Sequence, residues 1–135
     1  MVDDRDAQPG TLRTTRTVPF PRGQGFRLRD DIIAAATAEL ERTDSEETIA
    51  MRALARRVGV APPSVFIHFP GWTAVIDAVV AEQLAVLLDQ IETAADRAGT
   101  NPVGPLYAMC SAYTGYALAH PARYRVLVGR RFAAD

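Results

Sequence analysis

Apolar residues recur every three or four positions through most of the chain, which is the spacing of a buried stripe on an α-helix. The first stripe predicts a helix over 28–42, with Leu28, Ile32, Ala36 and Leu40 on its inner side. The polar stretch "TDSEE" then interrupts the pattern and favours a turn. About six such helical segments follow one another, with no convincing strand and no repeat, so the pattern predicts an all-α fold.

A second helix is predicted to begin after Thr48, the best local N-cap, and to end at Gly59, because glycine accepts the left-handed conformation cheaply. Its inward side is expected to hold Met51, Leu54, Ala55 and Val58. Another helical pattern starts about three residues later, with Val60 filling the angle between the two helices. Helix, short glycine turn and helix together are the outline of a helix-turn-helix motif.

The pair Pro62–Pro63 stands directly before this third helical segment. Because a residue that precedes a proline is disfavoured in the α conformation, we expect Ala61 and Pro62 to be extended and Pro62 to be the N-cap. Pro63 would then be the first residue of a short helix that runs to about Phe69. Its missing N–H costs nothing there, since first-turn amides have no partner within a helix.

The register of this short helix divides its side chains between two sides. The inward side is predicted to hold Val65, Phe66 and Phe69, and the outward side Pro63, Ser64, Ile67 and His68. An isoleucine beside a serine and a histidine is a poor surface for water. It suits the major groove of DNA, where apolar atoms meet thymine methyl groups and polar atoms meet base edges or phosphates.

Three further helices are predicted after the short one. Trp72 opens a long helix that ends near Gly99, with an inward stripe of Ile76, Val80, Leu84, Leu87, Ile91 and Ala95. Asn101 is expected to cap the next helix, with Pro102 as its first residue. That helix carries Leu106, Met109 or Cys110, Tyr113 and Ala117, and it stops before Pro121, where a last segment with Tyr124, Leu127, Val128 and Phe132 begins.

Charge is distributed unevenly along a chain whose net charge is only −1. All fifteen cationic side chains are arginines, which a GC-rich genome explains most simply, although each guanidinium is also suited to phosphate. Residues 48–72 contain Arg52, Arg56 and Arg57 and no acidic residue, whereas the flanking segments are acidic. Positive charge is therefore concentrated on the predicted helix-turn-helix.

Residues 1–26 are rich in proline and glycine and are predicted to form a flexible basic arm, with Arg5, Arg13, Arg16 and Arg22. Such an arm is either a solvated tail or a contact to the DNA backbone or minor groove.

The acidic N-terminus is unlike a signal peptide, and no apolar run reaches the length of a membrane span. A single cysteine, Cys110, suits a reducing compartment and is expected to be buried. We therefore expect a cytoplasmic protein with no metal site and no cofactor.

The stretch from "IIAAATAEL" through "IAMRALARRVGVAPPSVFIHF" resembles the TetR-type one-component regulators, and the later "YALAHPARYRVLV" is similar to ligand domains in part of that family. The resemblance implies a helix-turn-helix DNA-binding domain over 27–72 and a helical regulatory domain over 73–135, expected to be incomplete. It implies a dimeric repressor that binds a pseudo-palindromic operator on double-stranded DNA and is released by a small-molecule inducer. Carried over by position, the DNA-contacting residues are Arg52, Pro63, Ser64, Phe66, Ile67, His68 and Trp72.

Several positions depart from the family's usual pattern. Phe66 replaces a tyrosine and Trp72 a lysine, and both usual residues reach phosphate, while Ala50 and Ala61 stand where a side-chain cap is common. Each lost phosphate contact flattens the salt dependence of binding by about 0.9 in slope. Arg29, or the arginines of the arm, would have to supply the missing contacts.

The chain is also shorter than the family's usual length. We therefore expect Tyr124, Leu127 and Phe132 to form an uncovered apolar patch. The shortness leaves open a second function, in which a truncated or degenerate relative acts as an interaction or heterodimer partner without binding DNA. An enzyme is not expected, because no nucleophile or paired carboxylate accompanies His68 at a meaningful spacing.

Overall fold

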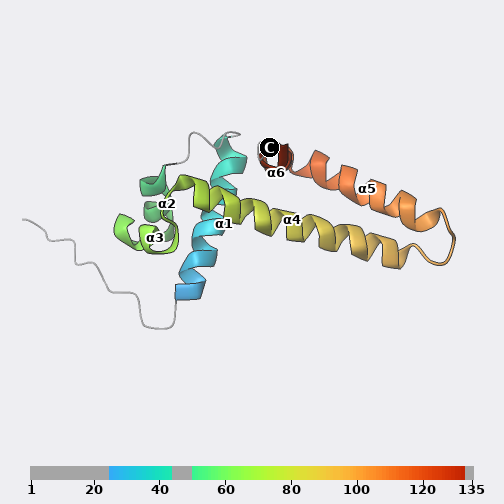
Figure 1. Ribbon diagram of the computed structural model, residues 1–135, viewed down its shortest axis with the longest axis horizontal. Coiled ribbons are helices and arrows are strands. Elements are labelled where there is room, and N and C mark those ends of the chain that lie inside the picture. Colours follow the sequence, from blue (N-terminus) through green and yellow to red (C-terminus); the bar gives the residue numbers. More distant parts are fainter. Residues whose placement is uncertain (1–24, 44–49, 133–135) are drawn as a thin grey trace, which may run out of the picture.

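The computed structural model describes residues 25–43 and 50–132, and all six helices within them are α-helical, with no strand among the described residues. The helices are α1 (Gly25–Thr43), α2 (Met51–Val58), α3 (Pro62–His68), α4 (Trp72–Arg97), α5 (Gly104–Ala119) and α6 (Pro121–Phe132). Figure 1 shows α2 and α3 gathered beside α1 at one end of the molecule, while the long helix α4 crosses α1 and extends to the other end. There the chain turns back, and α5 runs alongside α4. The predicted all-α fold is confirmed.

The first of two core clusters contains side chains from α1, α2, α3 and α4. Its centre is a set of fully buried aliphatic side chains, which includes Ile32, Leu40, Leu54, Val65 and Val75. On α1 the buried Ile32, Ala36 and Leu40 are four residues apart, as are Val75 and Val79 on α4, so one stripe of each of these helices faces the same centre. The cluster extends past residue 72 along α4 to Val79 and also contains Ala122 of α6. The segment 27–72 thus shares its core with parts of the two later helices.

The second cluster lies between α4, α5 and α6. Leu87, Tyr116 and Leu127 are buried in it, and Tyr124 and Val128 pack against it. The expectation that Leu127 is uncovered is therefore wrong, because α4 and α5 together cover the inner side of α6. The side chain of Phe132 lies outside the described part of the structure.

The inward stripe of α4 differs in part from the predicted one. Ile76 and Leu87 are buried as expected, but the other predicted members are only half-buried, and Val75, Val79 and Gln83 are buried instead. The three additional residues and Leu87 are spaced four apart, so they form one continuous row. This row faces the first cluster at its start and α5 and α6 further along.

Two helices begin later than the sequence predicted. Ala50, not Thr48, is the N-cap of α2, and the Ala50 carbonyl accepts the amides of Ala53 at 2.8 Å and Leu54 at 3.1 Å. Thr48 itself lies outside the described residues. Asn101 does not cap α5, because its Oδ1 accepts the amide of Val103 at 3.1 Å within a turn that precedes the helix. α5 then begins at Gly104, with Pro105 rather than Pro102 in its first turn.

α5 exposes more apolar side chains than the sequence suggested. Its sixteen residues include no charged side chain, and the helix contacts only α4 and α6 among the described elements. Its exposed large side chains are Leu106, Tyr107, Met109, Tyr113 and Leu118. Cys110 is exposed as well, so the expectation of a buried thiol is wrong.

None of the described helices alone has both the length and the hydropathy of a membrane span. α3 and α4 meet these criteria only when counted together, across a bend of 59°.

Candidate nucleic-acid interface

The turn between α2 and α3 is closed by Gly59, whose φ of 80° and ψ of 28° are left-handed. The amides of Gly59 and Val60 both donate to the Ala55 carbonyl, at 3.0 and 2.9 Å, and so satisfy the end of α2. Any other residue at position 59 would be strained, because a side chain disfavours this backbone conformation. Val60 is half-buried and packs against the first cluster, as predicted. The turn therefore fixes the angle at which α3 leaves α2.

The proline pair lies in the first turn of α3, but one position earlier than predicted. Ala61 is the N-cap, with the expected extended backbone (φ −69°, ψ 144°), and Pro62 and Pro63 are the first two helical residues. The assignment of Pro62 as the extended cap is therefore wrong. The amide of Ser64 donates to the Ala61 carbonyl at 2.9 Å, and this bond closes the turn around both prolines. Neither proline sacrifices a hydrogen bond, because both occupy positions whose amides have no acceptor within the helix.

The register of α3 is set by two buried side chains one turn apart. Val65 is fully buried and Phe69 is 3% exposed, which confirms their predicted inward direction. Ile67 is 81% exposed, as predicted for the outward side. Phe66 was predicted to point inward and is instead 49% exposed. With Val65 and Phe69 occupying the contact with the core, Phe66 lies about 100° around the helix from Val65 and falls on its flank.

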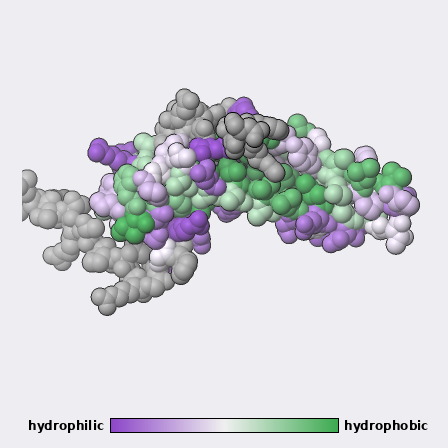
Figure 2. Space-filling view, viewed as in Figure 1, coloured by the Kyte–Doolittle hydropathy of each residue, from purple (hydrophilic) through white to green (hydrophobic). Residues whose placement is uncertain are grey.

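The remaining predicted residues of α3 frame this apolar surface. Pro63 is exposed, while Ser64 and His68 are half-buried at either side of it. A side-chain carbon placed on Gly25 would lie 3.7 Å from Cε1 of His68, so the first residue of α1 sits beside the end of α3. In Figure 2, hydrophobic residues gather at the end of the molecule where Figure 1 places α3. We call the outward side of Pro63, Ser64, Phe66, Ile67 and His68 the α3 face.

Positive charge lies next to this face, on α2. Arg52, Arg56 and Arg57 are all exposed, and α2 packs directly against α3. Within the part of the chain that the structure describes, Arg52 and Arg56 form no ion pair. α3 itself carries no Asp, Glu, Arg or Lys. An uncharged helix thus packs against one that carries exposed arginines, whose guanidinium groups are the donors best suited to phosphate oxygens.

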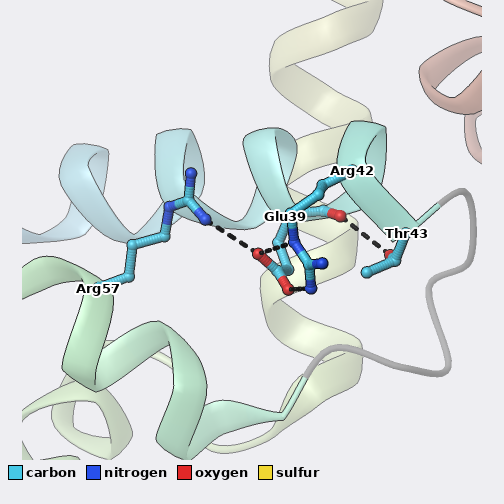
Figure 3. A network of polar contacts seen from close by, with 4 residues as sticks. All are labelled: Glu39, Arg42, Thr43 and Arg57. Atoms are coloured by element: carbon cyan, nitrogen blue, oxygen red, sulfur yellow. Dashed lines mark hydrogen bonds and ion pairs between the residues drawn. The ribbon is translucent and has the colours of Figure 1, made fainter.

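Arg57 has a second role that the sequence did not reveal. Its Nη1 donates to Oε2 of Glu39 on α1 at 3.0 Å, and Arg42 pairs with the same carboxylate (Figure 3). The hydroxyl of Thr43 donates to the Glu39 carbonyl at 2.9 Å. The hydrogen bond from Arg42 is the largest cause that lowers the pKa of Glu39 below its ordinary value. This network ties α2 to α1 and so holds the helix that carries the arginines.

Arg29 and Trp72 lie near the C-terminal end of α3. The guanidinium carbon of Arg29 is 5.4 Å from the centre of the Phe69 ring, a cation–π arrangement that places a cation of α1 next to α3. Trp72 begins α4 as predicted, but it is half-buried and packs against the first core cluster. Trp72 therefore packs against the core, although it is one of the predicted contact residues.

A polar network on the far side of α1 joins four helices. Nε of Arg123 on α6 lies 2.7 Å from Oε1 of Glu41 on α1, although its N–H is not directed at that oxygen. Nη1 of Arg123 donates at 3.2 Å to Oε1 of Gln83 on α4, and the hydroxyl of Tyr116 on α5 donates to the same oxygen at 3.0 Å. The Arg123 guanidinium is the main cause that lowers the pKa of Glu41, and Nδ1 of His120 lies 3.4 Å from that carboxylate. One side chain thus connects α1 with the three later helices.

Sequence reasoning missed Glu39, Gln83 and Arg123 as the centres of these networks. A local signal existed for Glu39, because Arg42 follows it by three residues on the same helical side. No local signal existed for Gln83 and Arg123, which are forty residues apart and meet only through the packing of α4 against α6.

Neither comparison with known proteins gave a relative: no family model matches this chain, and no curated protein matches it. Among the described residues, no group of three His, Cys, Asp or Glu side chains is placed to hold a metal ion.

Proposed function

We propose that this protein is a DNA-binding transcriptional regulator of the TetR type, acting as a repressor. The observation that carries the proposal is the exposure of Ile67 on a helix whose opposite side is fully buried. Phe66 beside it is exposed as well, and adjacent exposed apolar side chains rimmed by polar residues are typical of a binding surface. Guanidinium groups on the neighbouring helix indicate that the partner carries negative charge.

Duplex DNA satisfies both requirements. Its major groove is wide enough for one helix, and its base edges are flanked by phosphates. In our proposal α2, the Gly59 turn and α3 act as a helix-turn-helix motif, with the α3 face in the groove. Arg52 and Arg56, which have no ion pair among the described residues, bind phosphates on either side. Such an activity places the protein in the cytoplasm, with its DNA target.

Control by a small-molecule inducer is part of the proposal. α4 supports it, because the helix contributes Val75 to the cluster beneath α3 and Leu87 to the cluster beneath α5 and α6. A ligand that binds the later helices better in one position of α4 than in another would shift the position of α3 as well. The Arg123 network offers a second connection, since it joins α6 to α1.

A second copy of the chain is also part of the proposal. α3 has only seven residues and reads only a few base pairs, so specificity on a pseudo-palindromic operator calls for two copies. α5 is the proposed contact between them, because it is uncharged, and its exposed side carries tyrosine, leucine and methionine. Depletion of charge and enrichment of aromatic and methionine side chains are typical of the centre of protein interfaces.

The alternative is an interaction partner without DNA binding. It is favoured by the replacement of two phosphate-contacting positions with Phe66 and Trp72, and by the apolar surface of α5. Fluorescence anisotropy with labelled random duplex DNA, over a series of salt concentrations, separates the two functions. A regulator binds at low salt, and its affinity falls steeply as salt rises. A protein that does not bind DNA at low salt supports the alternative.

A further inference from the structure

The two most exposed large side chains of α3 are neighbours in sequence and both are apolar. Ile67 is 81% exposed and Phe66 is 49% exposed, while the polar Ser64 and His68 beside them are half-buried. The part of α3 that projects furthest is therefore a branched aliphatic group with an aromatic ring on its flank. A partner that contacts this face first meets hydrocarbon.

The composition of α3 restricts which base-pair features it can recognise. Guanine is usually bound by arginine or lysine, adenine by asparagine or glutamine, and the cytosine amino group by aspartate or glutamate. α3 has none of these residues; its sequence is PPSVFIH. The one apolar group that the major groove presents is the C5-methyl group of thymine.

The positive charge near α3 complements its uncharged outward side. The exposed guanidinium groups of Arg52 and Arg56 lie on α2, and that of Arg29 lies over Phe69 at the border of α3. Cations at the border hold the phosphates, which fixes the position of the helix without reading sequence. Base recognition is then left to the uncharged centre of the face.

We propose that Ile67, with Phe66 at its side, recognises thymine methyl groups, so that the preferred half-site contains a thymine whose methyl group contacts Ile67. This inference rests on the proposed function, and it adds the chemical feature that the face reads. Ser64 and His68 would contribute hydrogen bonds at neighbouring base edges. Removal of one buried methyl contact is expected to weaken binding about fourfold to tenfold per half-site.

The test removes the two sides of the same contact in turn: the thymine methyl group from the DNA and the Ile67 side chain from the protein. A duplex enriched by selection from a random pool is remade with deoxyuridine in place of one thymine at a time, which deletes only the C5-methyl group. Anisotropy titrations then compare the wild type, Ile67→Ala and the control Leu88→Ala, which truncates an exposed apolar residue on α4, outside the α3 face and the proposed contact on α5. Because Ile67 is exposed, circular dichroism should show the same helix content in all three.

The expected result is one thymine per half-site at which deoxyuridine weakens binding by the wild type and by Leu88→Ala. At the same position, deoxyuridine should not weaken binding by Ile67→Ala any further. Tight, selective binding that no deoxyuridine changes would overturn the inference and leave the regulator proposal intact. Binding without any enriched motif would overturn the inference while leaving DNA binding in place. Failure to bind any duplex at low salt would overturn both.

Discussion

Val65 and Ile67 lie two residues apart on α3 and face opposite ways: Val65 is fully buried in the first core cluster, and Ile67 is directed into solvent. The burial of Val65 fixes the rotation of α3 about its axis, and this rotation determines which side chains of α3 face solvent. The proline pair and Gly59 fix where α3 begins. Together these residues hold a seven-residue helix, too short to be stable alone, in one defined position.

Ser64→Ala combined with His68→Ala should abolish sequence-specific binding while leaving helix content unchanged. Both side chains border the apolar centre of the α3 face, where they can reach base edges or phosphates. A base contact contributes about 1–3 kcal/mol of discrimination, so the loss of two brings specific binding close to the nonspecific level. Titrations of the enriched duplex and a scrambled duplex, with circular dichroism as the folding control, measure this. Preserved preference for the enriched duplex would refute the assignment of the face.

Arg52→Ala should weaken binding to all DNA sequences about equally. The side chain is exposed on α2 and is proposed to contact phosphate, so its removal lowers the slope of log affinity against log salt by about 0.9. Arg97→Ala is the matched control, because Arg97 lies in the last turn of α4, far along the chain from the face. An effect confined to one base position would count against a backbone contact by Arg52.

The stability of the fold should fall in acid, and Glu39 should be one cause. Hydrogen bonding to Arg42 lowers the pKa of Glu39 in the folded protein below its ordinary value of 4.5. The unfolded chain therefore binds more protons, so the contribution of Glu39 is complete above about pH 4.5 and is lost as the pH falls through the folded pKa. Urea unfolding between pH 7 and pH 3 should show a shallower acid loss for Glu39→Gln than for the wild type. Glu92→Gln, at an exposed position, is the reference variant. An equal acid loss of stability in Glu39→Gln and the wild type would show that Glu39 is not involved.

Light scattering with a mass readout should find a dimer of the 14.7 kDa chain, and charge on α5 should dissociate it. Tyr107 and Leu118 are exposed and lie eleven residues apart, which places them on one side of the helix. Tyr107→Glu combined with Leu118→Glu places two carboxylates in the proposed contact, where burial would be costly. Gln90→Glu on the exposed side of α4 is the control. A wild type that stays monomeric at all concentrations would remove α5 as the dimer contact.

The sequence predicted several parts of the fold that depend on neighbours along the chain, although three of the predicted helix caps were wrong. Gly59, Ala61 and the spacing of Val65 and Phe69 are local features, and each has the predicted conformation or direction. The prediction failed for Phe66, because a short helix buries only one row of side chains, and in α3 that row consists of Val65 and Phe69. Spacing alone does not decide between two apolar neighbours.

Features that depend on distant packing were not predictable. α5 contains no charged residue, so no polar stripe marks its outer side, and only the positions of α4 and α6 decide that Tyr116 is buried and Cys110 is exposed. The pairing of Arg57 with Glu39 likewise depends on the angle between α1 and α2. Local spacing does not determine that angle.

The most direct test compares the affinities of Ile67→Glu, Leu88→Glu and the wild type for one duplex enriched by selection. A glutamate at position 67 would bring a carboxylate into a groove lined by phosphates, whereas Leu88 is exposed on α4, outside both the α3 face and the proposed contact on α5. We predict at least about tenfold weaker binding by Ile67→Glu with unchanged thermal stability, and wild-type affinity for Leu88→Glu. Equal binding by Ile67→Glu and the wild type would show that the outward side of α3 does not enter the DNA.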